Sequence, residues 1–223
     1  MAKRMILLIN KPLHWTSFDV VKKLRSILHT SKIGHAGTLD PLATGLLIIC
    51  SGSDTKSISH YQNLEKTYTG SLVLGKTTPS VDLETDFNSN TPYTHITANV
   101  IHQAATTFIG TTVQIPPAYS AIKLKGERAY KKARKGEIVK LLAREVFIRR
   151  FSINNIALPQ VDFEIVCGKG AYVRSLVRDL GEKIGVGAYL KALCRTHIGE
   201  YQLKDAEEIT SLQSIRYAGK HLP

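Results

Sequence analysis

The sequence lacks features that define several large classes of protein. Its 223 residues contain only three cysteines, Cys50, Cys167 and Cys194, which are far apart and have neither the CxxC spacing of a metal site nor the even count of a disulfide framework. The longest apolar runs, residues 5–9 and 46–50, fall far short of the ~18–20 residues that span a bilayer. We therefore expect a reduced, cytoplasmic protein with no membrane span.

Acidic residues are also scarce. Eighteen Asp and Glu stand against 30 Lys and Arg, so the formal net charge is +12 and the sequence pI is about 9.6. Such an excess favours a polyanionic partner, either a nucleic acid or an anionic membrane surface. The apolar fraction of 43% is enough for a buried core and argues against global disorder. The apolar stretch at residues 5–9 is too short for a signal peptide, so we expect no secretion signal.

The positive charge is concentrated in one segment. Residues 123–150 hold eleven basic and three acidic side chains, which is most of the net charge in one eighth of the chain. The segment can simply be a solvated helix face. Tyr119 and Tyr130 accompany its first lysines, however, and aromatic rings among cations suit RNA, whose bases stack while its phosphates pair. A membrane-surface helix needs a strong apolar face, which residues 123–136 lack, so RNA is favoured.

Strands and helices alternate along the chain without a regular βαβ rhythm, which predicts an α+β fold. Strands are expected over residues 5–10, 46–50, 68–74, 146–153 and 161–167. Helices are expected from Thr16 or Ser17 to residue 28, and over 96–108, 172–184 and 205–215. The polar stretch 77–93, with two prolines, predicts a surface excursion. No repeat or linker interrupts the chain, so one domain over residues 1–223 is expected.

The segment with the clearest chemical character is residues 34–45, GHAGTLDPLATG. Its three glycines allow unusual backbone angles and close approach of a ligand to the main chain. Asp40 precedes Pro41, which disfavours helical angles at Asp40 and can hold its carboxylate out from the loop. A carboxylate fixed in this way is a candidate nucleophile or general base. The alternative is an Asx turn in which Asp40 only satisfies backbone amides.

Five segments extend this pattern along the chain. They are residues 10–12 with 15–17, residues 32–47, residues 66–68, residues 116–123, and residues 168–176 followed by 179–181. In this order they resemble the motifs of the TruB family of tRNA pseudouridine synthases. The resemblance covers nearly all of residues 5–200.

The resemblance implies a fold and a reaction. The implied fold is the pseudouridine synthase fold, with a mixed, mostly antiparallel central sheet flanked by helices. The implied reaction converts uridine to pseudouridine at position 55, in the TΨC loop of tRNA, by flipping the base, breaking its bond to C1′ and rejoining it through C5. It requires neither a cofactor nor a metal. We expect a monomer with tRNA as its partner.

The resemblance also gives roles to residues of the site. It makes Asp40 the catalytic residue and places Tyr68 against the uracil, although a strand tyrosine can equally pack in the core. It pairs Arg174 with the aspartate, where the alternatives are phosphate binding or a surface cation. Tyr172 is expected at the floor of the pocket. His35 is expected to help displace the base, where the alternative is an ordinary surface histidine.

Residues 116–144 match the family's RNA-gripping insertion, or thumb. Within it we expect RNA contacts from Tyr119, Lys123, Lys131, Lys132 and Arg134. Lys11 belongs to a second RNA-facing segment. Many relatives carry a C-terminal PUA domain, and the residues after 199 are too few for one, so none is expected.

Two departures from the family pattern stand out. His14 occupies a position where many relatives have glycine, and residues 77–82 differ from a more common turn, so no catalytic role is assigned to Asp82. Two rival functions remain. One is an RNA-binding or tRNA-folding protein without catalysis, against which the intact set of Asp40, Tyr68 and Arg174 argues. The other is a hydrolase or phosphotransferase that uses Asp40, which needs a second carboxylate that residues 33–47 do not provide.

Overall fold

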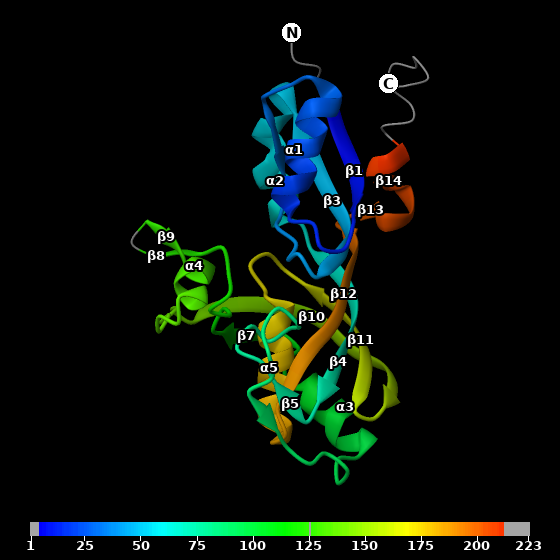
Figure 1. Cartoon of the computed structure of the whole chain (residues 1–223). Coiled ribbons are helices and arrows are strands. Elements are labelled where there is room, and N and C mark those ends of the chain that lie inside the picture. Colours follow the sequence, from blue (N-terminus) through cyan, green and yellow to red (C-terminus); the bar gives the residue numbers. More distant parts are fainter. Residues whose placement is uncertain (1–4, 125, 212–223) are drawn as a thin grey trace. The chain divides into compact units, whose positions relative to one another are not determined.

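The computed structural model describes residues 5–124 and 126–211, which form two compact units (Figure 1). Unit 1 contains residues 5–68 and 193–211, and unit 2 contains residues 69–192. The chain enters unit 2 along strand β4 (Lys66–Leu74) and returns along strand β12 (Ala188–Ile198). These two strands therefore carry residues of both units.

Unit 1 is built on a mixed sheet with the strand order β14-β1-β3-β12. Strand β1 runs antiparallel to β3, whereas β3 pairs in parallel with β12. Besides β4 and β12, the strands of this unit are β1 (Met5–Lys11), β2 (Ile33–His35), β3 (Ala43–Ser51), β13 (Tyr201–Gln202) and β14 (Glu207–Glu208). Its 3-10 helices are η1 (Gly52–Ser57) and η2 (Leu203–Asp205). Strand β2 pairs with β3. It continues into the loop of residues 36–42, called the Asp40 loop below.

Strand β3 is the centre of unit 1 because both of its faces are buried. Leu47 and Ile49 pack beneath helix α1 (Ser17–Leu28). The alternate residues, including Leu46 and Ile48, pack on the other side with Tyr61 of helix α2 (Ile58–Asn63). A strand buried on two faces needs a continuous apolar run instead of an alternating one, which confirms the strand predicted at residues 46–50.

Helix α1 begins where its sequence predicts. Thr16 is the N-cap, its hydroxyl accepts a hydrogen bond from the Asp19 amide at 3.0 Å, and the Asp19 carboxylate accepts one from the Thr16 amide at 2.9 Å. This reciprocal capping box satisfies two amides that the helix leaves unpaired. Val20, Leu24 and Ile27 then face the sheet, so the cap fixes both the start of the helix and the rotation of its apolar stripe.

Unit 2 contains a second array of strands, in the order β12-β4-β11-β10-β7. Strands β7 (Gly110–Gln114), β10 (Arg144–Ala157) and β11 (Gln160–Cys167) form antiparallel ladders. Helix α3 (Ala98–Thr106) contacts β10 and helix α5 (Val173–Ile184). A minor two-stranded sheet joins β5 (Lys76–Thr77) to β6 (Ser89–Asn90). With the mixed sheet and the helices, these strands confirm the predicted α+β class.

The basic insertion leaves and rejoins unit 2 at one ladder. Strand β7 ends at Gln114, which pairs with Arg144 at the start of β10. Between them lie the hairpin β8 (Lys123–Leu124) and β9 (Glu127–Arg128) and the short helix α4 (Ala129–Arg134). Figure 1 shows this hairpin and α4 set apart from the sheet strands of unit 2. The insertion is thus a separate substructure anchored at both of its ends.

Some expectations from the sequence need correction. Strands β2 and β12 were not predicted, because their residues have no clear alternation. The stretch 77–93 is not simply a surface excursion, since Thr78, Ser80 and Asp82 are buried within it. Asp205 does not cap a helix but ends the short 3-10 turn η2; helical backbone begins at Ile209, and the rest of that predicted helix lies outside the described residues. Within residues 5–124 and 126–211, no helix is long and apolar enough to cross a membrane.

Gly45 and Gly110 provide a matched test of backbone packing. Their φ angles are +104° and +101°, yet a Cβ at Gly45 would lie 2.4 Å from the Arg195 carbonyl oxygen, whereas one at Gly110 meets nothing within 4 Å. We expect Gly110→Ala to cost about 1–2 kcal/mol of unfolding free energy from the left-handed backbone alone. Gly45→Ala should cost more than about 3 kcal/mol because a backbone clash is added. Urea unfolding of both variants measures this, and equal losses would contradict the packing described.

Candidate active site

The loop that carries Asp40 is fixed on both sides of that residue. The amide of Ala36 donates to the Ile48 carbonyl at 2.8 Å, which ties the start of the loop to β3. The buried hydroxyl of Ser17 accepts from the Leu39 amide at 2.9 Å. After Asp40, the Pro41 carbonyl accepts from the amide of His14 at 2.8 Å. A half-buried carboxylate thus sits between two anchored residues, which is the geometry that catalysis by a carboxylate requires.

His14 has an unusual backbone that this anchoring explains. Its φ is +66°, in the left-handed region that favours glycine, and its amide makes the hydrogen bond to Pro41. A histidine at this position keeps the turn that a glycine adopts without strain, at a conformational cost. The departure from the family pattern at His14 therefore leaves the local backbone in the conformation that glycine favours.

Lys11 is a structural cation of this site, which corrects the expectation that it faces RNA. Its side chain is fully buried, and its ammonium donates to the carbonyls of Pro12 at 2.9 Å and Trp15 at 2.6 Å. Burial lowers the pKa of Lys11 to about 8, while the negative charge of Asp40 opposes that shift. An ammonium that already bonds two carbonyls in the interior holds the turn before α1 and lies within the electrostatic reach of Asp40.

His35 and Tyr68 also belong to unit 1. His35 ends strand β2, and its half-buried ring has a lowered pKa, first because of burial and then because of the charge of Arg195. The imidazole is therefore neutral near neutral pH. Tyr68 is half-buried on strand β4. An uncharged ring suits the displacement of a base, and a half-buried phenol is not a fully packed core residue.

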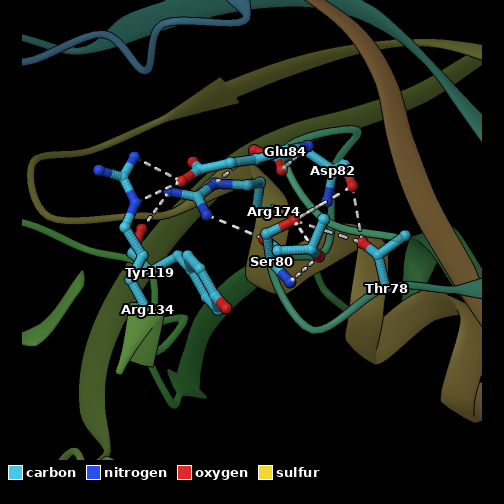
Figure 2. Close-up of polar contacts among 8 residues, drawn as sticks. Thr78, Ser80, Asp82, Glu84, Tyr119, Arg134 and Arg174 are labelled. Carbon is cyan, nitrogen blue, oxygen red and sulfur yellow. Dashed lines mark hydrogen bonds and ion pairs between the residues drawn. The ribbon is translucent and has the colours of Figure 1, made fainter. Parts of the chain in front are cut away.

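Arg174 occupies a dense polar cluster in unit 2 (Figure 2). It is 3% exposed, and its guanidinium donates to the carbonyls of Ser80 at 2.9 Å and Tyr119 at 2.8 Å. Its Nε lies 3.7 Å from the buried Oδ2 of Asp82. This arrangement rules out the alternative of a surface cation, because a helix-surface arginine is not held by three groups in the interior.

Asp82 is the residue that the sequence analysis missed. The amide of Glu84 donates to its Oδ1 at 3.0 Å, and its carbonyl accepts from the hydroxyls of Thr78 at 2.7 Å and Ser80 at 3.1 Å (Figure 2). The turn is tight enough to force Val81 to a φ of +64°. Strain of this kind on a β-branched residue persists only where the surroundings impose it, and it is typical of functional sites. The alternation of Thr78, Ser80 and Asp82 is the only sequence signal for this buried cluster.

Tyr172 and Tyr119 lie beside Arg174. The amide of Tyr172 donates to the Gln114 side chain at 2.8 Å, whose amide nitrogen donates back to the Tyr172 carbonyl at 3.1 Å. The guanidinium of Arg144 lies 4.8 Å from the centre of the Tyr172 ring, a cation–π arrangement. Tyr172 is therefore held by both strands of the ladder, at the end from which the insertion leaves.

The basic residues of the insertion are partly neutralised within the protein. Lys132 forms ion pairs with Glu127 at 3.4 Å and Glu137 at 2.9 Å. Arg134 donates through two nitrogens to one oxygen of Glu84, at 3.0 and 2.6 Å (Figure 2). Lys123 and Lys131 are exposed. Among the described residues, neither of these two exposed lysines forms such an ion pair, whereas the charges of Lys132 and Arg134 are partly compensated by carboxylates.

The predicted site residues thus fall into two groups. Unit 1 contains Asp40, Lys11, His35 and Tyr68, and unit 2 contains Arg174 with Tyr172, Tyr119 and the insertion. The pairing of Arg174 with Asp40 stays a prediction. Among the described residues, no three His, Cys, Asp or Glu side chains are grouped so that they could hold a metal ion.

Comparison with known proteins gives the arrangement a context. A profile described as "TruB family pseudouridylate synthase (N terminal domain)" matches residues 25–173. The chain is 49% identical over 212 residues to tRNA pseudouridine synthase B of Flavobacterium johnsoniae, covering 92% of this chain and 93% of that protein. It is 48% identical over 206 residues to the protein of the same name from Chlorobium chlorochromatii, covering 90% and 81%. These matches define a pseudouridylate synthase.

Solved structures show the same fold. A crystal structure of a Cbf5-Nop10-Gar1 complex contains a chain that aligns with a TM-score of 0.73 at 23% identity, over 97% of this chain and 56% of that one. A structure of an H/ACA RNP bound to a substrate RNA containing 2′-deoxyuridine gives a TM-score of 0.71 at 21% identity, over 97% and 56%. The protein described here belongs to the TruB family.

The buried ammonium of Lys11 predicts a pH dependence of stability. Native Lys11 loses its proton near pH 8, whereas the unfolded chain keeps it to about pH 10.5. Between these values the unfolded state binds more protons, so stability from this group rises with pH. We expect the free energy of unfolding of the wild type, relative to Lys11→Met, to increase from pH 8 to pH 10. Urea unfolding of both proteins across this range measures the difference, and a constant difference would contradict the burial of the ammonium.

Proposed function

We propose that this protein converts uridine to pseudouridine at position 55, in the TΨC loop of tRNA, with Asp40 as the catalytic residue. The single observation that supports this most is the anchoring of the Asp40 loop through Ser17 and His14 in a member of the TruB family. The names of the relatives, tRNA pseudouridine synthase B, support tRNA as the substrate. Acting on tRNA, the enzyme works in the cytoplasm, as a monomer and without a cofactor.

The reaction is an isomerisation and needs no external reagent. The bond between uracil N1 and ribose C1′ breaks, the freed base turns, and a bond forms between C5 and C1′. The proton on C5 is then lost and N1 gains one, so atoms and charge balance. A fixed carboxylate can serve this sequence by attacking the base, by attacking the ribose or by accepting a ribose proton. In each case Asp40 must be ionised, and the neighbouring ammonium of Lys11 favours that form.

The remaining site residues displace, bind and orient the target base. A target uridine in the folded tRNA elbow has to leave its stack, which costs a few kcal/mol, and the neutral ring of His35 is suited to occupy the space it leaves. Tyr68 lies against the flipped uracil and is placed to handle the C5 proton. Arg174, fixed by Ser80, Tyr119 and Asp82, orients the Asp40 carboxylate. Tyr172 forms the floor of the pocket.

The insertion over residues 116–144 acts as the RNA-gripping thumb of this single catalytic domain. Tyr119, Lys123, Lys131, Lys132 and Arg134 supply an aromatic ring and four cations for a phosphate backbone. Arg134 stacks on Tyr130 at 5.3 Å, so the helix presents charge and ring surface together. A catalytically idle RNA-binding protein shares this surface, and the carboxylate of Asp40 distinguishes the two functions.

The substitution Asp40→Asn tests the catalytic assignment. We expect it to abolish turnover and to leave tRNA affinity within a few fold, because Asp40 acts on the base and anchors no phosphate. Tritium release from C5-labelled uridine in a tRNA transcript measures turnover, and filter binding measures affinity. Release by Asp40→Asn at the wild-type rate would remove Asp40 from catalysis, while tight binding by wild type without any release would favour the idle RNA-binding protein.

Activity that survives excess EDTA counts against a metal-dependent hydrolase or phosphotransferase.

The thumb is tested by joint neutralisation of Lys131, Lys132 and Arg134. Each cation that pairs with a phosphate releases counterions from the RNA. The logarithm of the binding constant therefore falls linearly with the logarithm of the salt concentration. We expect the triple glutamine variant to bind tRNA more weakly and with a shallower salt dependence, by about one unit of slope for each lost contact. Lys191→Gln, on strand β12, is the control. An unchanged slope in the triple variant would exclude these residues from the interface.

A further inference from the structure

Arg195 is the largest of the fully buried side chains, and nothing in the reaction outlined above uses it. It lies on β12 in unit 1 and is 1% exposed. Burying a guanidinium is costly unless its donors are satisfied and its charge is compensated. The burial of Arg195 therefore has to be explained, and the hydrogen-bond partners of its guanidinium indicate the explanation.

Both partners of Arg195 are carbonyls of the segment that contains Asp40. Nε donates to the Leu46 carbonyl at 2.8 Å, and Nη2 donates to the Gly37 carbonyl at 3.1 Å. Gly37 precedes Asp40 by three residues and Leu46 follows it by six. One rigid, planar group thus joins the start of the loop, at Gly37, to strand β3, at Leu46, and a guanidinium is suited to this because its donors are fixed relative to one another.

The glycines of the loop fit this side chain and its backbone. Strands β12 and β3 pair in parallel with Arg195 opposite Gly45, and a Cβ at Gly45 would lie 2.7 Å from the Arg195 amide nitrogen. At Gly37, whose φ is +103°, an added Cβ would lie 3.6 Å from Nη1 of Arg195. Gly45 therefore allows the main chain of β3 to pass close to that of Arg195, whereas Gly37 supplies the left-handed backbone and is at ordinary contact distance from the guanidinium.

The charge of Arg195 also reaches the site. It lowers the pKa values of Lys11 and His35, so its field extends to the residues around the loop. Lys11 and Arg195 place two buried positive charges in the same region, and the negative charge that acts on Lys11 there includes that of Asp40. Because Lys11 and Arg195 donate to carbonyls, both keep their positive charge, and that charge favours the ionised form of a nearby carboxylate.

We propose that Arg195 is a positioning residue for Asp40, which closes the loop through the carbonyls of Gly37 and Leu46 and holds the carboxylate in its reactive place. The proposal rests on the function proposed above for Asp40. It concerns a residue that does not touch the substrate and acts only through the loop.

The test compares Arg195→Met, which removes charge and donors, with Arg195→Lys, which keeps the charge and can reach one carbonyl. Lys191→Met, an exposed position on the same strand, is the matched control. The measurements are the single-turnover rate of pseudouridine formation in a tRNA transcript, the Kd for that tRNA, and amide hydrogen exchange of residues 36–48 against that of helix α1.

We expect Arg195→Met to slow the single-turnover rate about 10- to 100-fold, the size of effect that a small misplacement of a catalytic group produces. The Kd should stay within threefold, and exchange should speed up in residues 36–48 while α1 keeps its protection. Arg195→Lys should recover part of the rate, and Lys191→Met should match wild type. Should Arg195→Met fail to fold, Arg195→Lys decides alone, by a reduced rate at an unchanged Kd.

Three results would overturn the proposal: a wild-type rate in Arg195→Met, a loss of rate matched by an equal loss of tRNA affinity, or faster exchange throughout α1 and the loop together. The last two would make Arg195 a general structural residue. If wild-type protein forms no pseudouridine, the proposed function fails, and the exchange of residues 36–48 still decides whether Arg195 closes the loop, because that measurement uses no substrate.

Discussion

The structure depends on hydrogen bonds from buried cations to main-chain carbonyls. Lys11 holds the turn before α1 through two carbonyls, and Arg195 ties the Asp40 loop to strand β3 through two more. A carbonyl partner satisfies a cation without neutralising it, so the positive charge stays available to a neighbouring carboxylate. A carboxylate partner would instead neutralise each cation, and the field around Asp40 would be weaker.

Unit 2 uses the same device with one addition. Arg174 also donates to two carbonyls, those of Ser80 and Tyr119, but it has a buried carboxylate, Asp82, at 3.7 Å. That distance is longer than an ideal hydrogen bond, so the carboxylate compensates the charge of the guanidinium while the two carbonyls fix its orientation.

Whether a feature of the fold or the site could be predicted from the sequence depends on whether its signal lies within a few neighbouring residues. The start of α1, expected at Thr16 or Ser17, and the buried run of β3 are signalled within a few residues, and the structure confirms both. The Asp40 loop was found because glycine density and an Asp-Pro pair carry a local meaning. Arg195 and Asp82 gave no such signal, because their roles depend on partners far along the chain, at Gly37 and Arg174. Lys11 was expected to contact RNA because its segment resembles an RNA-facing segment of the family, and only the fold shows that its side chain is enclosed.

The pairing of Gln114 with Arg144 has a consequence for how this fold can vary. The basic insertion begins and ends on neighbouring positions of one ladder, and its ends are therefore already closed by the sheet. Lengthening such a segment costs only about 0.6 kcal/mol for each doubling, so the hairpin of β8 and β9 can gain residues at little conformational cost if Tyr119 and Arg134 keep their contacts to Arg174 and Glu84. Gln114 also holds the main chain of Tyr172 through two hydrogen bonds, so the position of Tyr172 is fixed by the base of the insertion and not by its tip. The tip can thus change in length in evolution or by design while the base that holds Tyr172 stays the same.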